Sequence, residues 1–416
     1  MAFQFLTAVR EQKIISWASA GLIIFISAFL WVPSRDGLQG VYLLGFFLPT
    51  LIILTLKKFS FDEYGGWPTI LALTYAGFSL LSTLWGEPKD FGFFLLQWCV
   101  LASWLCGSCL VFIKREINVE KYLEWFVAIG VLATIIAMVR YYFFVFGVST
   151  IDNRLSGWNV FRNPNEIGAM CGIIALLAFN IGVRSSSLKR VWLFYLLTSI
   201  ATLGLVASFS RSALSAFIIM SFITLLLARP PLKVWLPPVL ISIIALLLLL
   251  DGTQILDYYY TAPRNQDFGG RFGIWQEVLY RSSENIFIGI GMTEDASISI
   301  ASSQTFNHAH NAWLDTLYRT GLIGLTLLLL HTTAIFQKAS RDPRLLPIFL
   351  WLGFGCLCNL LDGRCFFWEI GAKWFLYWIP AGLIVAITTG IKIRALQTNN
   401  SSTIKSPLLS SINSGS

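Results

Sequence analysis

Histidine is the side chain that most readily gains or loses a proton near neutral pH, and this sequence of 416 residues has only three of them. Two, His308 and His310, stand in the run N-H-A-H-N at 307–311, where a polar segment ends and a long apolar run begins. A histidine at such a boundary can take a proton from an incoming hydroxyl group. It can equally be an interfacial residue that only caps a helix. His310 is therefore a candidate general base with a structural alternative.

Two arginines upstream favour the catalytic interpretation of His310. Arg211 stands in S-F-S-R-S between two apolar runs, and Arg271 follows two glycines at the expected start of a surface helix. A guanidinium binds phosphate oxygens in pairs, and the first turn of a helix offers free N–H groups to an anion. Arg211, Arg271 and His310 therefore predict an anionic leaving group held beside a base. For Arg271, pairing with lipid head groups is the alternative.

Other polar residues near these positions have two interpretations. We expect Arg140, near the outer end of a predicted span, and Arg319, further along the run that follows His310, to line the same cavity. Asp315 lies four residues before Arg319, so the two can instead form a structural ion pair on one helix face. The sequence has no metal-binding motif and no P-loop or dinucleotide fingerprint, so we expect neither a metal nor another cofactor. The arginines would then supply the positive charge that a metal supplies elsewhere.

The composition decides the class of protein. The chain is 56% hydrophobic and 12% charged, with a mean hydropathy of +0.69, which excludes a soluble domain of this length. It predicts an all-α polytopic membrane protein. The net charge of +8 is then information on membrane topology and anionic ligands, and not a sign of nucleic-acid binding.

Twelve apolar runs are long enough to cross a bilayer, which needs about 20 residues. A large outer loop at 251–310 separates the ninth run from the tenth. Within it, Phe272, Trp275, Val278 and Leu279 have helical spacing and predict an amphipathic helix on the membrane surface. Residues 398–416 are rich in Ser and Asn and predict a disordered tail. The runs are 14–32, 40–56, 68–85, 91–113, 122–148, 166–183, 191–209, 212–228, 234–250, 311–336, 345–361 and 370–390.

The distribution of basic residues predicts the orientation. With the N-terminus inside, short basic loops such as those at 114–115 and 189–190 all fall on the cytoplasmic side, as the positive-inside rule requires. Both termini are then cytoplasmic, and His310 faces outward. The basic residues of the outer side are nearly all arginine, which suits phosphate binding.

These motifs resemble the O-antigen ligase and polymerase superfamily of bacterial membrane glycosyltransferases. The ligase signature of that family is H-[NSK]-x9-G-x2-[GTY], which His310, Asn311, Gly321 and Gly324 match. S-R-S-A-L at 210–214 and G-R-F-G-I-W at 270–275 are similar to its two arginine motifs, and N-P-N at 163–165 is similar to another recurrent pattern. The short motifs cover some forty residues, but their order and the span layout cover the whole chain.

The resemblance implies an O-antigen ligase of the bacterial inner membrane, with its active site in the periplasm. Its donor would be a glycan on undecaprenyl pyrophosphate and its acceptor a sugar hydroxyl of lipid A-core, and transfer would invert the anomeric carbon without a metal. Arg211 and Arg271 would hold the pyrophosphate, and His310 would activate the acceptor. Further substrate-binding candidates are Arg140, Arg162, Asn163, His308, Asn311 and Arg319.

Three alternatives to a ligase remain open at this stage. The same superfamily includes O-antigen polymerases and protein oligosaccharyltransferases, but this chain has one dominant outer loop and little further outer sequence. A different class is an anion transporter with arginines along its path. The arginines cluster on one side, and no inverted repeat is found, which counts against a transporter.

Overall fold

The computed structural model describes residues 2–56, 60–86, 90–145, 154–231, 271–299 and 305–405. Within these ranges, eleven helical segments are long and apolar enough to cross a membrane, and they overlap eleven of the twelve predicted runs. The remaining run, 234–250, and residues 251–270 of the outer loop lie outside the described residues. The expectation of an all-α polytopic membrane protein is confirmed.

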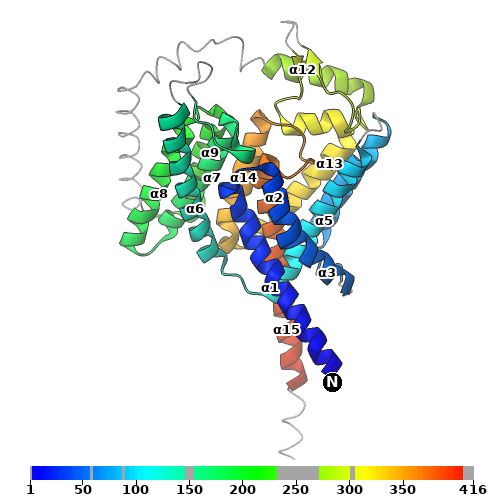
Figure 1. Ribbon diagram of the computed structural model, residues 1–416, viewed down its shortest axis with the longest axis vertical. Coiled ribbons are helices and arrows are strands. Elements are labelled where there is room, and N and C mark those ends of the chain that lie inside the picture. The colour runs from blue at the N-terminus through cyan, green and yellow to red at the C-terminus, as the bar shows by residue number, and fades with distance from the viewer. Residues whose placement is uncertain are drawn as a thin grey trace, which may run out of the picture.

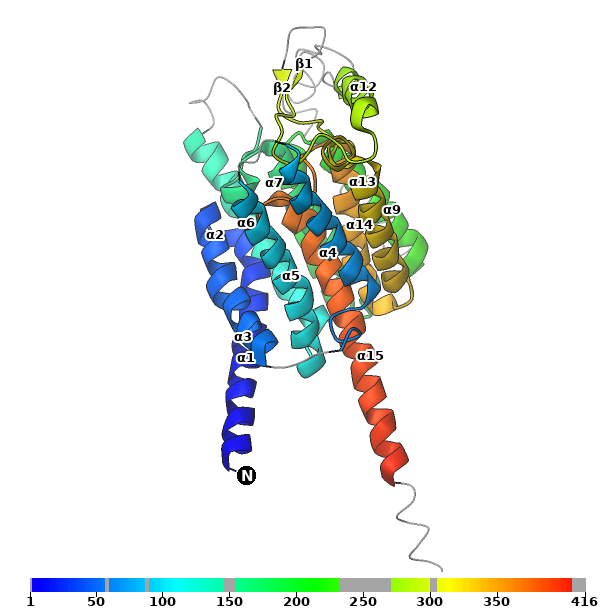
Figure 2. The ribbon, with the colours of Figure 1, turned by 90° about the vertical axis from the view of Figure 1, so that its right-hand side faces the viewer.

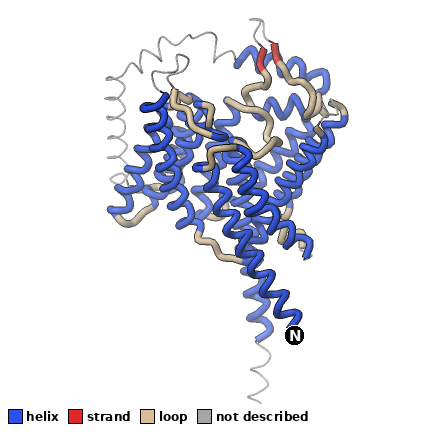
Figure 3. Tube along the Cα trace, viewed as in Figure 1, coloured by secondary structure: helices blue, strands red, loops and turns tan. Residues whose placement is uncertain are grey.

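The α-helices form one bundle (Figure 1). Its only described strands, β1 (Ile298–Ser299) and β2 (Thr305–Phe306), pair as a short antiparallel hairpin (Figure 3). The helices are α1 (Ala2–Trp31), α2 (Arg35–Tyr42), α3 (Leu48–Leu56), α4 (Trp67–Leu81), α5 (Phe91–Lys114), α6 (Val119–Arg140), α7 (Pro164–Arg184), α8 (Leu188–Ala207), α9 (Arg211–Ala228), α12 (Arg271–Ser282), α13 (Ala312–Ser340), α14 (Leu346–Leu361) and α15 (Ile379–Lys405).

The two ends of the bundle differ. The start of α1 and the end of α15 lie at one end, and α12, β1 and β2 lie at the other (Figure 1 and Figure 2). We call the second end the outer end, following the predicted orientation. The turns that carry the predicted site residues reach this outer end.

Two helices form the centre of the described bundle. In their most apolar windows, α7 is 94% buried and α15 is 89% buried, whereas α8 and α9 are only about one third buried. A helix that is apolar on all sides is stable where other helices surround it. Indole N–H groups in this core donate to backbone carbonyls, as from Trp104 to Trp378, from Trp351 to Phe375 and from Trp378 to Phe366, each at 2.8 Å. These bonds tie α5 and α14 to the segment 374–378 that leads into α15, and tie that segment to the loop before it.

Three described membrane helices contain or end in short π-helical segments: Leu43–Phe47, Tyr141–Val145 and Trp374–Trp378. The first and the last lie just before a proline, Pro49 or Pro380. A proline has no N–H donor, and its ring clashes with the carbonyl four residues earlier, so the local hydrogen-bond register widens.

Two expectations differ from the observed fold. The last helix, α15, continues to Lys405, so residues 398–405 are helical where we expected disorder; residues 406–416 lie outside the described part. The good helix formers at 392–397 extend the helix past the apolar run. In α12, Ile274 and Val278 are buried, whereas Phe272 and Leu279 are 66% and 51% exposed. This helix therefore buries its face against Ile298, Ala309 and their neighbours.

Candidate functional site

The loop that carries His310 runs from β2 to α13. Asn311 ends the loop as the N-cap of α13, and its side-chain oxygen accepts the N–H groups of Trp313 and Leu314 at 3.0 and 3.1 Å. Asn311 is thus a helix cap, and its amide oxygen is engaged in the protein. His310 itself has φ of +49°, a left-handed backbone that few residues other than glycine adopt.

A break in α13 explains the spacing between His310 and Gly321. Gly321 has φ of +63° and ψ of −168°, so the helix stops and restarts there. The segment 286–291 supplies partners for the interrupted backbone: the N–H of Leu322 donates to Ile286 at 2.8 Å, and that of Gly291 donates to Arg319 at 2.9 Å. The break fixes the first part of α13, and hence His310, against this outer segment.

Asp315, on the first turn of α13, joins two loops at the site. Its fully buried carboxylate accepts the N–H of Ala309 at 3.3 Å and that of Cys365 at 2.8 Å. The same carboxylate accepts Arg319 Nε at 3.2 Å, and Arg319 also donates to the carbonyl of Met292 at 2.9 Å. The structural ion pair is therefore the correct interpretation of Arg319, since its guanidinium is buried among protein acceptors.

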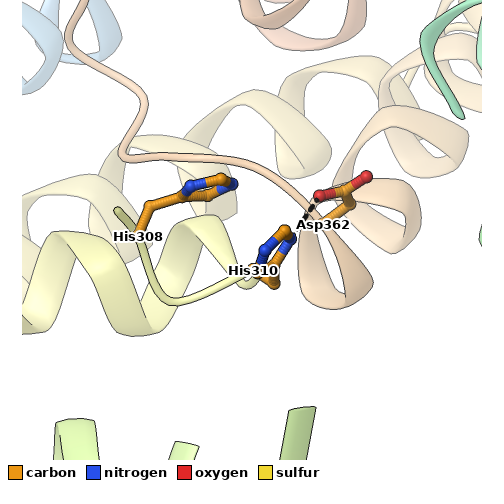
Figure 4. Close-up of side chains that lie close together, drawn as sticks. All are labelled: His308, His310 and Asp362. Carbon is orange, nitrogen blue, oxygen red and sulfur yellow. Dashed lines mark hydrogen bonds and ion pairs between the residues drawn. The ribbon is translucent and has the colours of Figure 1, made fainter. Parts of the chain in front are cut away.

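The loop held by Cys365 begins with Asp362, which faces His310. His310 Nδ1 and Asp362 Oδ1 are 3.1 Å apart (Figure 4). Asp362 Oδ1 also accepts the N–H of Gly363 at 2.7 Å, and Oδ2 accepts the side-chain amide of Asn165 at 2.8 Å. Burial raises the pKa of Asp362, but the hydrogen bond from His310 and the charge of Lys373 outweigh it and hold this pKa well below its usual range. Asp362 is therefore a carboxylate at neutral pH.

A chain of hydrogen bonds connects this pair to the turn that carries Arg211. Arg154 donates from Nη2 to the side-chain oxygen of Asn165 at 2.8 Å, and from Nε to the carbonyl of Ser208 at 3.0 Å. Ser208 ends α8, and Arg211 begins α9 three residues later. The turn with Arg211 is thus fixed relative to Asp362.

Arg271 begins α12 and is coupled to the same group of residues. Trp275, on the next turn of α12, donates its indole N–H to the carbonyl of Ala309 at 3.0 Å, beside His310. Burial lowers the pKa of Arg271. The negative charge of Asp362 raises this pKa, and the positive charge of Arg211 lowers it further. The bond from Trp275 to Ala309 and the bonds from Arg154 to Ser208 and Asn165 tie the starts of α12 and α9 to the loops that carry the His310–Asp362 pair. An anion can compensate the two guanidinium charges.

His308 lies directly against His310, with ring centroids 4.1 Å apart. Burial, and secondly the neighbouring His310, lower the pKa of His308 to about 4, so its imidazole is neutral at neutral pH. One ligand atom from each of His308, His310 and Asp362 lies within 4.8 Å of the others, a set that could hold a metal ion such as zinc. Because both Asp362 oxygens already accept protein hydrogen bonds, the observed geometry fits an imidazole–carboxylate pair better.

The remaining predicted residues lie at a different place on the outer end. Arg140, Arg162 and Asn163 line a cavity there, and Asn163 caps α7 by accepting the N–H of Asn165 at 2.8 Å. The expectation that Arg140 and Arg319 share a cavity is wrong, because Asp315 holds Arg319 inside the protein.

The sequence alone did not indicate that Asp362, Asn165 and Arg154 are site residues. Asp362 had a signal, since it is an acidic residue directly after an apolar run at the predicted outer end. Nothing in the spacing pairs it with His310, which lies 52 positions earlier. Asn165 was noted only as part of N-P-N.

Comparisons with known proteins agree on one family. Residues 194–329 match the O-antigen ligase family, and this range includes Arg211, Arg271 and His310. An O-antigen ligase of Pseudomonas aeruginosa is 26% identical to this chain over 377 residues, which is 88% of this chain and 89% of that protein. The similarity therefore extends across most of the chain.

Proposed function

We propose that this chain, which is similar to O-antigen ligases, transfers an O-antigen glycan from undecaprenyl pyrophosphate to a sugar hydroxyl of lipid A-core. The reaction would take place at the periplasmic face of the bacterial inner membrane. The observation that carries this proposal is the contact of 3.1 Å between His310 Nδ1 and Asp362 Oδ1 at the outer end of the bundle.

His310 is the acceptor's general base in this mechanism. A neutral imidazole has one N–H and one lone pair, and an N–H on Nδ1 donates to the Asp362 carboxylate. The lone pair is then on Nε2, where it takes the proton of the acceptor hydroxyl. As that O–H bond breaks, the oxygen attacks the anomeric carbon of the donor. Asp362 stabilises the imidazolium that forms.

Arg211 and Arg271 stabilise the leaving group. The bond from the anomeric carbon to the phosphate oxygen breaks as the new glycosidic bond forms, so undecaprenyl pyrophosphate leaves with increased negative charge. Two guanidinium groups can each donate a pair of N–H bonds to its oxygens. Attack opposite to the leaving group inverts the anomeric carbon. No step requires a metal or ATP, because the pyrophosphate is already an activated leaving group.

The proposal is tested with purified protein, the lipid-linked donor and lipid A-core. We expect His310→Ala to abolish transfer while the protein still inserts in the membrane. Arg211→Lys and Arg271→Lys should each lower kcat/KM at least about 100-fold, because a lysine cannot donate the paired bonds. Arg184→Lys is the matched control, an exposed arginine that ends α7 at the opposite end of the bundle. Normal transfer by the His310 variant would refute the assigned mechanism.

A lipopolysaccharide gel from cells without this protein separates the ligase from the related activities. Core without O-antigen, together with long polymer on the carrier lipid, is the result expected for a ligase. Core that carries a single repeat unit would indicate a polymerase instead. An unchanged ladder would contradict both.

A further inference from the structure

A cavity at the outer end, with a volume of about 790 Å³, has no role in the mechanism above. It lies between the turn from α1 to α2, the end of α6 and the start of α7. Its polar lining residues include three arginines and a single acidic residue: Arg35, Arg140, Arg162 and Glu166. We call it the arginine cavity.

Two of these arginines have no compensating charge among the residues that the structure describes. Arg35 forms an ion pair with Glu369. Arg140 and Arg162 are exposed and have no ion pair or hydrogen bond with any residue that the structure describes. Two unpaired guanidinium groups at one cavity attract an anion with several acceptor oxygens, as a phosphate has.

Neutral polar groups in the same lining also lack partners. Asn159 donates its amide to the carbonyl of Val32 at 3.0 Å, which fixes the side chain against the α1–α2 turn. Its oxygen and the indole N–H of Trp158 are inaccessible to solvent and have no hydrogen-bond partner among the described residues. Such groups are rare without a partner, but a ligand in the cavity contacts neither atom unless the lining rearranges.

The position of Arg140 relates the cavity to the lipid. Arg140 is the last residue of α6, and the preceding turns expose apolar side chains: Leu132 is 57%, Ile136 49% and Val139 46% exposed. Such a face of a membrane helix contacts acyl chains. Arg140 thus joins the lipid-facing surface to the cavity, at the level where phosphates of lipid head groups lie.

The first turn of α7 connects the arginine cavity to His310. Asn163 and Glu166 line the cavity, and Asn165, between them, donates to Asp362 at 2.8 Å. A head group bound in the cavity is therefore separated from the His310–Asp362 pair by one helical turn. This turn is rigid, because Asn163 and Glu166 form a capping box.

We propose that the arginine cavity binds a phosphate group on the head group of the lipid-anchored acceptor, and that Arg140 and Arg162 contact this phosphate. The inference rests on the proposed function, and it assigns the two substrates to different arginines. Arg211 and Arg271 bind the donor's pyrophosphate, whereas Arg140 and Arg162 hold the acceptor with a hydroxyl toward His310.

The test measures transfer at varied acceptor concentrations, with native and with phosphatase-treated acceptor. We expect Arg140→Gln and Arg162→Gln each to raise KM for the native acceptor about tenfold, since each removes a charge-assisted hydrogen bond. The KM for the donor should not change. With dephosphorylated acceptor, wild type and variants should have the same raised KM. Arg341→Gln, an exposed arginine at the opposite end of the bundle, is the control.

A binding measurement separates failure of this inference from failure of the proposed function. Labelled acceptor is titrated without donor against nanodiscs that contain the His310→Ala protein, with and without the Arg140 and Arg162 changes. Weaker binding in the arginine variants supports the cavity even where no transfer occurs. Unchanged KM and binding would overturn it. Equal competition by phosphatidylglycerol would also overturn it, because the cavity would then bind any lipid phosphate.

Discussion

At the scale of single residues, the backbone of His310 is the most informative feature. A φ of +49° costs a histidine free energy, about 1–3 kcal/mol for a non-glycine residue. The surrounding contacts maintain it: Asp315 and Trp275 hold Ala309 on one side, and Asn311 caps α13 on the other. The strain directs the imidazole toward Asp362, which is the geometry that the proposed proton transfer needs.

Asp362→Asn tests this pairing. An asparagine keeps the size of the side chain, but its amide can donate to Nδ1 and move the imidazole proton to Nε2, which then cannot accept a proton. We expect kcat for glycan transfer to fall roughly 100-fold or more at pH 7. Measured protein levels in the membrane should remain near those of the wild type.

Asp342→Asn is the matched control, since Asp342 lies at the opposite end of the bundle and pairs only with the exposed Arg344 among described residues.

The lowered pKa of Asp362 also predicts how stability depends on pH. Because the pKa of Asp362 is lower in the folded than in the unfolded protein, its ionised carboxylate stabilises the fold at every pH above the unfolded-state pKa of about 4. This stabilisation is lost only as the pH falls below about 4. Wild-type stability between pH 5 and 8 should thus not depend on Asp362 titration, and a transition there that Asp362→Asn removes would contradict the assignment.

Removal of metal ions distinguishes two interpretations of His308, His310 and Asp362. Their ligand atoms lie close enough to hold an ion, but the hydrogen bonds of Asp362 favour a metal-free pair. We expect EDTA or a zinc chelator to leave the transfer rate of purified protein unchanged within about twofold. Loss of activity that added zinc restores would show that the three residues form a metal centre.

At the scale of elements, Gly321 illustrates which parts of a motif the sequence explains. The spacing from His310 to Gly321 was available as a family pattern, but its physical reason is the crossing of the segment 286–291 over the broken α13. A Cβ at Gly321 would lie 2.2 Å from the carbonyl carbon and oxygen of Phe287. No one-dimensional periodicity reveals such a crossing.

Gly321→Ala should therefore lower both stability and activity. The left-handed φ and the contact with Phe287 together predict a loss of at least about 2 kcal/mol in the free energy of unfolding, measured as a lower Tm in detergent. The transfer rate should fall by more than the loss of folded protein accounts for, because the break in α13 also orients His310. Gly40→Ala, in α2, is the control, since a Cβ there meets no atom within 4 Å. Equal effects of both changes would contradict the role of the break.

The other elements likewise divide into features that the sequence predicts and features that depend on tertiary contacts. Hydropathy predicted the spans well, because burial in lipid requires long apolar helices and little else. It did not predict which face of α12 is buried, since Ile274 and Val278 pack against a small core formed by the loop itself. Arg211, Arg271 and His310 were found from residue type and motif, whereas Asp362, Asn165 and Arg154 required tertiary contacts between distant turns.

At the scale of the whole molecule, the two ends of the bundle differ in their basic residues. The end that holds both described chain ends carries short loops with mixed Lys and Arg, and the other end carries Arg211, Arg271 and the arginine cavity. Under the positive-inside rule, we expect the end with Arg211 and Arg271 to face away from the cytoplasm. This orientation suits a reaction between two lipid-anchored substrates, because both acyl parts stay in the membrane while their head groups meet at its outer surface.

Cysteine labelling in intact cells tests the orientation. Glu284 follows α12 at the outer end, and Ser340 ends α13 at the opposite end; both are exposed. We expect a membrane-impermeant maleimide to label Glu284→Cys in cells whose outer membrane is permeabilised, and to label Ser340→Cys only after lysis. The wild-type chain, with its seven free cysteines, measures the background. The reverse pattern would place His310 in the cytoplasm, where a donor exposed at the periplasmic face could not reach it, and would refute the proposed site of transfer.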